Sequence, residues 1–270
     1  MSFEADNTNP FCRNPVERDL LAGRRIAIVG CGSFGSALAD MLVRAGVGKL
    51  TLVDPELLAI ENLGRHVLTR RDVGQPKVHA LARRLRDINP DLEVEARWEK
   101  FRNADGLLVC CADSRRCESM VNAVSLARRV PAVFVAAYGA VRAGEVQLCV
   151  PGRTACRECF AQFREPAGPS PRAERYTDPE FDETRTPGRS GLWGSVLAVS
   201  GIAFHAILAL LGVRPGPDLD RPLWIVNLDY QGFPPYAVTF ASVRRGCPVC
   251  DESRIADLQV DDRPPGAITE

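Results

Sequence analysis

The sequence has no net charge and few histidines, and its first residues do not resemble an export signal. Its 34 basic residues balance 34 acidic residues, which argues against general affinity for nucleic acid or an anionic membrane surface. Residues 1–11 contain no basic start followed by an apolar run, so we expect no secretory signal and a cytoplasmic protein. Only His66, His79 and His205 could serve as imidazole acids or bases near neutral pH.

Cysteine, by contrast, is abundant, with ten residues in a chain of 270. Without an export signal, cysteines indicate metal ligands, buried apolar residues or reactive thiols before they indicate disulfides. Four of them form two Cys-x-x-Cys pairs, Cys156 with Cys159 and Cys247 with Cys250. Paired knuckles of this kind predict a tetrahedral zinc site that ties two remote parts of the chain together. Redox disulfides are the alternative interpretation.

Four thiolates on one Zn²⁺ leave an excess of negative charge, which nearby cations can offset. Arginines flank both knuckles. We expect this compensation from Arg153, Arg157, Arg244 and Arg245.

One apolar segment, residues 192–212, is nearly long enough to cross a bilayer. It contains Gly194, Ser200 and His205, and no basic cluster flanks it. We therefore expect a buried helix that packs against a sheet.

A glycine-rich turn follows the first apolar run, in RIAIVGCGSFGSALADML at residues 25–42. The pattern predicts a strand, a tight turn and a helix whose N-terminus binds phosphate, with Gly30, Gly32 and Gly35 as binding residues. Asp54 ends the second apolar run, where an acid would bind a ribose hydroxyl. NAD, FAD, S-adenosylmethionine and ATP all use this pattern, and a close-packed turn without a ligand is a further alternative.

The alternation of apolar strands and amphipathic helices predicts an α/β fold: a Rossmann-like, mainly parallel sheet with helices on both faces. After residue 140 the pattern changes to antiparallel strands and the zinc knuckle. The expected strands are 25–29, 49–54, 92–98, 106–113, 131–138, 144–150, 222–230 and 236–243, and the expected helices are 34–45, 75–90, 115–130 and 192–212.

The composition also divides the chain. We expect an N-terminal arm with a short helix at 1–23, a single domain at 24–252 and a polar tail at 253–270. Within the domain, the nucleotide-binding part spans about 24–140. Residues 164–191 are dense in proline, glycine and charge, which predicts a crossover loop over a functional site.

Residues after the second strand favour a triphosphate over NAD. Asn62, Arg65 and Lys77 follow that strand, and Asp113 ends a third buried strand. Parallel strands end at one sheet edge, so these groups should meet there. Two cations and an amide suit a triphosphate better than the pyrophosphate of NAD, which backbone amides largely satisfy. An acid beside phosphates indicates a magnesium ion.

These motifs resemble those of the ThiF/MoeB/HesA family, the adenylyltransferases related to ubiquitin-activating enzymes. The resemblance rests on Gly30–Gly35, Asp54, ENLGRH, QPK and CCADS and runs from about residue 20 to residue 252. It implies an enzyme that uses Mg·ATP to adenylate the C-terminal glycine carboxylate of a ubiquitin-like or sulfur-carrier protein, releasing pyrophosphate. It also implies a structural zinc, a homodimer and a downstream acceptor protein.

The resemblance assigns the individual roles. Ser33 stands where the family usually has a glycine, and His66 where it often has glutamine, and neither change removes a group that the chemistry needs. An arginine of the N-terminal arm would reach the partner's triphosphate, with Arg13 the first candidate and Arg18 the second. The implied roles are ribose binding for Asp54, phosphate binding for Asn62, Arg65 and Lys77, magnesium binding for Asp113, and catalysis for Arg65, Lys77, Asp113 and Arg13.

The chemistry of adenylation is consistent with these assigned residues. A carboxylate is already ionised at pH 7, so adenylation needs cations and positioning rather than a general base. Relatives that form a thioester carry a cysteine in an inserted domain or in the loop corresponding to 164–191. That loop has none here, so we expect transfer to an acceptor on another protein, with Cys12 or Cys117 as the alternative nucleophile.

Three alternatives remain open at this point. A nicotinamide-dependent oxidoreductase is disfavoured by Asn62, Arg65, Lys77 and the cysteine pairs. A non-catalytic scaffold subunit of a heterodimer would be favoured by loss of the ATP residues. The third alternative keeps the chemistry but changes the substrate to a peptide or a small acid.

Overall fold

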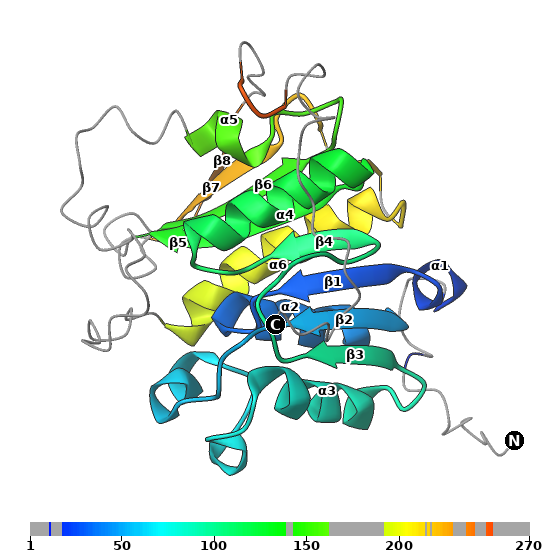
Figure 1. Cartoon of the computed structure of the whole chain (residues 1–270), viewed down its shortest axis with the longest axis vertical. Coiled ribbons are helices and arrows are strands. Elements are labelled where there is room, and N and C mark those ends of the chain that lie inside the picture. The colour runs from blue at the N-terminus through cyan, green and yellow to red at the C-terminus, as the bar shows by residue number, and fades with distance from the viewer. Residues whose placement is uncertain are drawn as a thin grey trace, which may run out of the picture.

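Eight strands form one mixed sheet in the order β3-β2-β1-β4-β5-β6-β7-β8 (Figure 1). The first five strands pair in parallel and the last three antiparallel. The strands are β1 (Arg25–Val29), β2 (Lys49–Val53), β3 (Glu93–Arg97), β4 (Leu107–Cys110), β5 (Ala132–Tyr138), β6 (Ala143–Cys149), β7 (Leu223–Asn227) and β8 (Tyr236–Phe240). The computed structural model describes residues 11, 18–138, 143–161, 192–213, 215–216, 218–228, 236–240 and 247–250.

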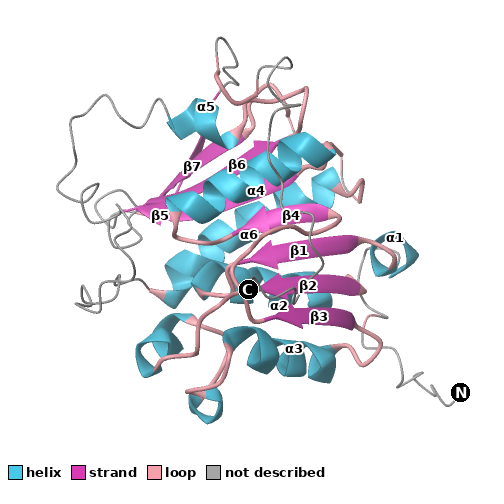
Figure 2. Cartoon of the chain, viewed as in Figure 1, coloured by secondary structure: helices cyan, strands magenta, loops and turns pink. Residues whose placement is uncertain are grey.

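Helices cover both faces of the sheet (Figure 2). Alternating residues of β1 separate the two layers: Ile26 and Ile28 belong to one buried cluster, and Ala27 and Val29 to the other. The first cluster includes α2 (Ser33–Arg44), α3 (Lys77–Ile88) and α6 (Trp193–Leu210), and the second includes α4 (Arg115–Arg128). The remaining short helices are α1 (Arg18–Ala22), α5 (Arg157–Ala161), η1 (Ile60–Arg65) and η2 (Arg70–Asp72). The fold expected from the sequence is confirmed.

The order of the strands reverses beside β1, which lies between β2 and β4. Hydrogen bonds continue the pairing beyond the strand ends, from the Gly30 N–H to the Val53 carbonyl (2.8 Å) and from the Cys111 N–H to the Val29 carbonyl (2.7 Å). Open α/β sheets bind ligands outside the carboxyl ends of strands at such a reversal. This edge is therefore where a ligand site is expected.

The apolar helix α6 packs against α2 and against β5 and β6, as expected of a helix that covers the sheet. The contact with β6 is close: a Cβ at Gly144 would lie 2.2 Å from Val199 Cγ2. By length and composition alone α6 could cross a membrane, and 39% of that stretch is buried inside the protein. Helices that cover a sheet inside a soluble domain can have the same length and apolar composition.

The sequence did not indicate helix α5, and it gave Arg157 the wrong partners. We expected Arg157 to offset the zinc thiolates, but its guanidinium pairs with two carboxylates instead. It donates to Glu118 of α4 (2.7 and 3.1 Å), to Glu145 of β6 and to Gln147 (2.9 Å). The side chains of Arg157 and Glu145 are each only 2% exposed. This buried network joins α4, α5 and the sheet.

Because this network is buried, we predict that replacing Arg157 lowers the free energy of unfolding, whereas replacing Arg153 does not. Arg157→Gln would leave Glu145 buried without its cation, which typically costs about 3–5 kcal/mol. The control is Arg153→Gln, because Arg153 is exposed. Urea unfolding should show the loss for Arg157→Gln alone. Equal stability of the two variants would contradict the structural importance of the network.

Candidate nucleotide and metal sites

Two of the three motif glycines are required by close backbone contacts. Gly30 has φ +87°, and a Cβ there would lie 2.7 Å from the backbone nitrogen of Ala112. A Cβ at Gly35 would lie 1.9 Å from the Gly30 carbonyl oxygen. Gly32 differs, because its φ is −77° and a Cβ would meet nothing within 4 Å. Gly30 and Gly35 therefore shape the turn, and Gly32 borders the open space where a ligand would lie.

Helix α2 begins at this turn, with Gly32 as its N-cap residue, and no side chain caps it. The first N–H groups of an α-helix have no partner within the helix, and the helix dipole makes this end electropositive. A twelve-residue helix that starts at an open glycine turn is therefore suited to bind phosphate.

Asp54 organises the turn from the end of β2. One of its carboxylate oxygens accepts the Cys31 N–H (2.7 Å), and the other accepts the Glu56 N–H (2.7 Å). Burial raises the pKa of Asp54, and the nearby Lys77 ammonium opposes that rise. Each carboxylate oxygen can accept a second hydrogen bond, so this geometry also permits the expected contact with a ribose hydroxyl.

Lys77 is the most unusual cation of this edge. It is 4% exposed and is the first residue of helix α3. The N-terminal end of a helix disfavours positive charge. Its ammonium pairs with Glu56, a residue that the sequence analysis did not single out. Burial would lower the pKa of Lys77, but the Asp54 and Glu56 carboxylates raise it instead. The lysine therefore stays charged although its position opposes the charge.

Backbone pairing places Glu56 beside Lys77. The Lys77 N–H donates to the Glu56 carbonyl (3.0 Å), and the Leu58 N–H donates to the Gln75 carbonyl (2.9 Å). The loop between β2 and α3 therefore closes on itself. Glu56 follows Asp54 by two residues, which is the one signal in the sequence that could have identified it.

The same loop is tied to the glycine turn by two consecutive side chains. Arg65 donates from Nε to Ser33 Oγ (3.0 Å), and the His66 ring nitrogen Nε2 lies 2.8 Å from the Cys31 carbonyl oxygen. Burial lowers the pKa of His66 to about 4, so its imidazole is neutral at pH 7. The Asn62 side-chain oxygen accepts the Ala59 N–H (3.0 Å) within η1, which leaves the amide NH₂ group as its donor end.

Asp113 lies at the same edge. It is exposed and follows Ala112, the residue that abuts Gly30. Ser114 then begins α4 by accepting the Cys117 N–H (3.4 Å). The structure thus brings the glycine turn, Asp54, Arg65, Lys77 and Asp113 together. Arg13 lies outside the described residues.

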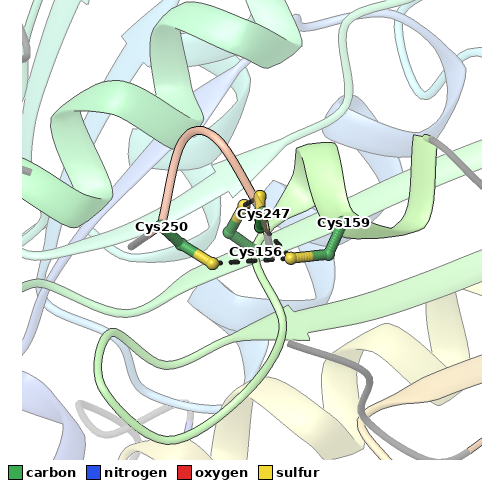
Figure 3. Close-up of side chains that lie close together, drawn as sticks. All are labelled: Cys156, Cys159, Cys247 and Cys250. Atoms are coloured by element: carbon green, nitrogen blue, oxygen red, sulfur yellow. Dashed lines mark hydrogen bonds between the residues drawn. The ribbon is translucent and has the colours of Figure 1, made fainter. Parts of the chain in front are cut away.

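The four knuckle cysteines form a compact buried cluster (Figure 3). Their sulfur atoms all lie within 4.8 Å of one another. The sulfur–sulfur separations are 3.8 Å for Cys156–Cys159, 3.8 Å for Cys156–Cys247 and 3.4 Å for Cys159–Cys250. Zinc–sulfur bonds of about 2.3 Å place the corners of a tetrahedron about 3.8 Å apart. The donor set and its spacing therefore fit zinc.

The cysteine cluster lies beside α5 and the β6 side of the sheet, away from the glycine turn after β1 (Figure 1). Leu126 of α4 and Phe160 of α5 pack around it. Strands β4 and β5 separate β1 from β6 in the sheet. An ion bound here would join residues 156–159 to residues 247–250.

Comparison with known proteins gives one family match. The model of the ThiF family matches residues 9–236. Ubiquitin-like modifier-activating enzyme 5 of Drosophila ananassae is 30% identical over 187 residues, which cover 59% of this chain and 47% of that protein. ATP-dependent ubiquitin transferase-like protein Cap2 of Pseudomonas aeruginosa is 46% identical over 88 residues, 31% of this chain and 16% of that protein. The chain spans about half the length of the curated activating enzymes that it matches.

Solved structures share the fold. Escherichia coli MccB with ATP superposes with a TM-score of 0.66 and 19% identity, covering 87% of this chain and 68% of MccB. MccB with MccA-N7isoASN gives a TM-score of 0.69 and 18% identity, covering 87% of this chain and 69% of MccB. At these identities the likeness describes the architecture.

The glycine geometry predicts opposite effects at two motif positions. Gly35→Ala forces a methyl group onto the Gly30 carbonyl and should destabilise the fold by about 1–3 kcal/mol or more. Gly32→Ala has a negative φ and its Cβ would meet nothing within 4 Å, so it should lose less stability than Gly35→Ala but weaken Mg·ATP binding. Urea unfolding and calorimetric titration measure the two effects. The prediction is wrong if Gly32→Ala binds normally or if Gly35→Ala is as stable as the wild type.

The cysteine cluster predicts one zinc per chain in protein purified under reducing conditions. Cys247→Ser should lose the metal, and Cys117→Ser should keep it. Because a structural zinc contributes several kcal/mol of folding free energy, its loss should lower the unfolding temperature by about 10 °C or more. Elemental analysis and thermal unfolding test both statements. Metal-free protein of undiminished stability would contradict them.

Proposed function

Because the chain belongs to the ThiF family, we propose that it is an ATP-dependent adenylyltransferase, which activates the C-terminal glycine carboxylate of a ubiquitin-like or sulfur-carrier protein. The observation that carries this proposal is Lys77. Its ammonium is buried at a helix N-terminus beside an uncapped glycine turn, and the Asp54 and Glu56 carboxylates keep it charged. A buried cation held charged at such a position is expected where an incoming polyanion uses the charge.

In the proposed complex the open space at Gly32 and the first turn of α2 receive the phosphates. Arg65 and Lys77 neutralise them, with the Asn62 amide as a further donor, and Asp54 binds the ribose. Asp113 would hold the magnesium ion, since Mg²⁺ in nucleotide sites typically takes one or two carboxylates together with phosphate oxygens. The ion would supply further positive charge at the phosphates.

The reaction needs no general base. A carboxylate oxygen of the substrate attacks the α-phosphorus, the bond to the bridging oxygen of the β-phosphate breaks, and pyrophosphate leaves with the electron pair. No proton is transferred, and the barrier arises from bringing two anions together. Cations and fixed N–H donors lower such a barrier. The only histidine that contacts the turn in the described part of the chain, His66, binds backbone groups with both ring nitrogens, which disfavours an oxidoreductase that needs a proton donor.

Glu56 gives Lys77 a partner that the nucleotide can replace. Its side chain is 50% exposed, whereas that of Lys77 is 5% exposed. The carboxylate can therefore turn to solvent when phosphate oxygens approach the ammonium. The non-catalytic scaffold alternative loses support, because the charged residues that this exchange requires are all present.

The fate of the adenylate follows from the available thiols. Burial raises the pKa of the Cys31, Cys111 and Cys149 thiols well above the usual value, which makes them poor nucleophiles. The loop 164–191 has no cysteine and lies outside the described residues, as does Cys12. We therefore infer direct transfer to an acceptor on another protein, with half-buried Cys117 as the alternative.

The proposal extends to assembly. The active form would be a homodimer, in which Arg13 of one subunit reaches the triphosphate of the other. The protein would act in the cytoplasm, with Mg²⁺ in the nucleotide site and Zn²⁺ in the cysteine cluster.

ATP–pyrophosphate exchange tests the function. We expect exchange only in the presence of a cognate substrate. The candidates to test are small proteins that end in glycine, and short peptides and small acids are tested in parallel. Lys77→Ala should slow exchange by a factor of about 100 or more, the scale for removing a transition-state electrostatic donor.

The matched control is Lys49→Ala, because Lys49 begins β2 at the opposite edge of the sheet and pairs with the exposed Glu93. It should leave exchange unchanged. Wild-type exchange in Lys77→Ala would refute the assignment, and exchange stimulated only by peptides or small acids would correct the substrate class.

A further inference from the structure

His66 is buried, and both of its ring nitrogens contact the backbone. The Leu68 N–H donates to Nδ1 (3.1 Å), so that nitrogen is an unprotonated acceptor. The ring proton of the neutral imidazole must then lie on Nε2, which donates to the Cys31 carbonyl oxygen (2.8 Å). The geometry thus fixes the tautomer, and no ring nitrogen is left for proton transfer to a substrate.

This contact determines how the glycine turn faces the nucleotide. The C=O and N–H groups of one trans peptide point in opposite directions. Since the Cys31 carbonyl points at His66, the Gly32 N–H of the same peptide points away from it. The preceding N–H, that of Cys31, is bound by Asp54 (2.7 Å). Asp54 and His66 therefore fix the two successive peptides that flank Cys31.

The neighbouring residue strengthens the link. Arg65 donates to Ser33 Oγ (3.0 Å), two residues after Cys31. Consecutive residues of the loop thus bind the turn at two points, so a displacement of His66 would also displace the Arg65 guanidinium.

We propose that His66 is a positioning residue of the nucleotide site: it holds the Cys31–Gly32 peptide so that the Gly32 N–H faces the phosphates, and it keeps Arg65 beside the turn. This inference rests on the proposed function, because it requires Mg·ATP as the ligand. It assigns His66 no contact with the nucleotide and no part in proton transfer.

Two amide substitutions separate the hydrogen bonds of the ring. In His66→Gln the side-chain NH₂ can reach the position of Nε2 and donate to Cys31. In His66→Asn the shorter amide can accept the Leu68 N–H near the position of Nδ1, but it cannot reach Cys31. His79→Asn is the matched control, because His79 is exposed on α3.

Calorimetric titration with Mg·ATP, which needs no acceptor protein, measures the effect. We expect His66→Asn to weaken binding about 10-fold or more, the scale of one hydrogen bond that holds a charge-binding group. His66→Gln should stay within about 3-fold of the wild type, and His79→Asn should be unchanged. Thermal unfolding supplies the second readout, because a merely structural role would make affinity follow stability.

The outcomes separate the two proposals. A difference in affinity between the Gln and Asn variants at similar unfolding temperatures supports the positioning role. Normal affinity in His66→Asn, or losses that follow stability alone, would refute it while leaving the adenylyltransferase proposal intact. If the wild-type protein fails to bind Mg·ATP, both proposals fail. A long-range ¹H–¹⁵N spectrum of the free protein at pH 7 should show the Nε2–H tautomer, and the other tautomer would overturn the inference without reference to nucleotide.

Discussion

The carboxylate of Asp54 is the interaction on which the candidate site depends. It accepts the Cys31 N–H from the glycine turn and the Glu56 N–H from the following loop, and its charge acts on Lys77. One buried side chain thus connects the end of β1, the end of β2 and the start of α3. A group that accepts two backbone N–H groups is well placed to fix a turn, because buried amides without partners are costly.

Two buried ionic clusters lie in the described part of the chain, and the exposure of their side chains distinguishes their roles. Around Arg157, both the arginine and Glu145 are sealed at 2% exposure, so neither partner can move into water. Around Lys77, the partner Glu56 is half exposed and can be replaced. Both clusters hold more carboxylates than cations. The sealed cluster suits a fixed joint between helix and sheet, whereas the open one suits exchange with an anionic ligand.

The fold could be predicted from the sequence because its signals are local. Apolar runs, the glycine turn and amphipathic periods predicted the strands and most helices within a few residues, and the Cys-x-x-Cys spacing predicted that the four cysteines lie together. Glu56 and the true partners of Arg157 were missed for a shared reason. Their roles arise from contacts between the loop after β2 and the start of α3, or between α4, α5 and β6, and no local pattern encodes such contacts. His66 was recognised only as a substitution in a motif, since its two bonds depend on how the loop folds back onto Cys31.

Helix α4 connects the two halves of the molecule. It begins after Asp113, at the nucleotide edge, and its first turn includes Glu118, which binds the Arg157 guanidinium through both carboxylate oxygens. Arg157 directly follows Cys156, and its own N–H donates to Asn122 of the same helix (2.9 Å). Any ion that fixes the cysteines therefore also fixes the residue that holds α4. Through Glu118, the segment that carries the first cysteine pair is thus tied to the helix that begins after Asp113.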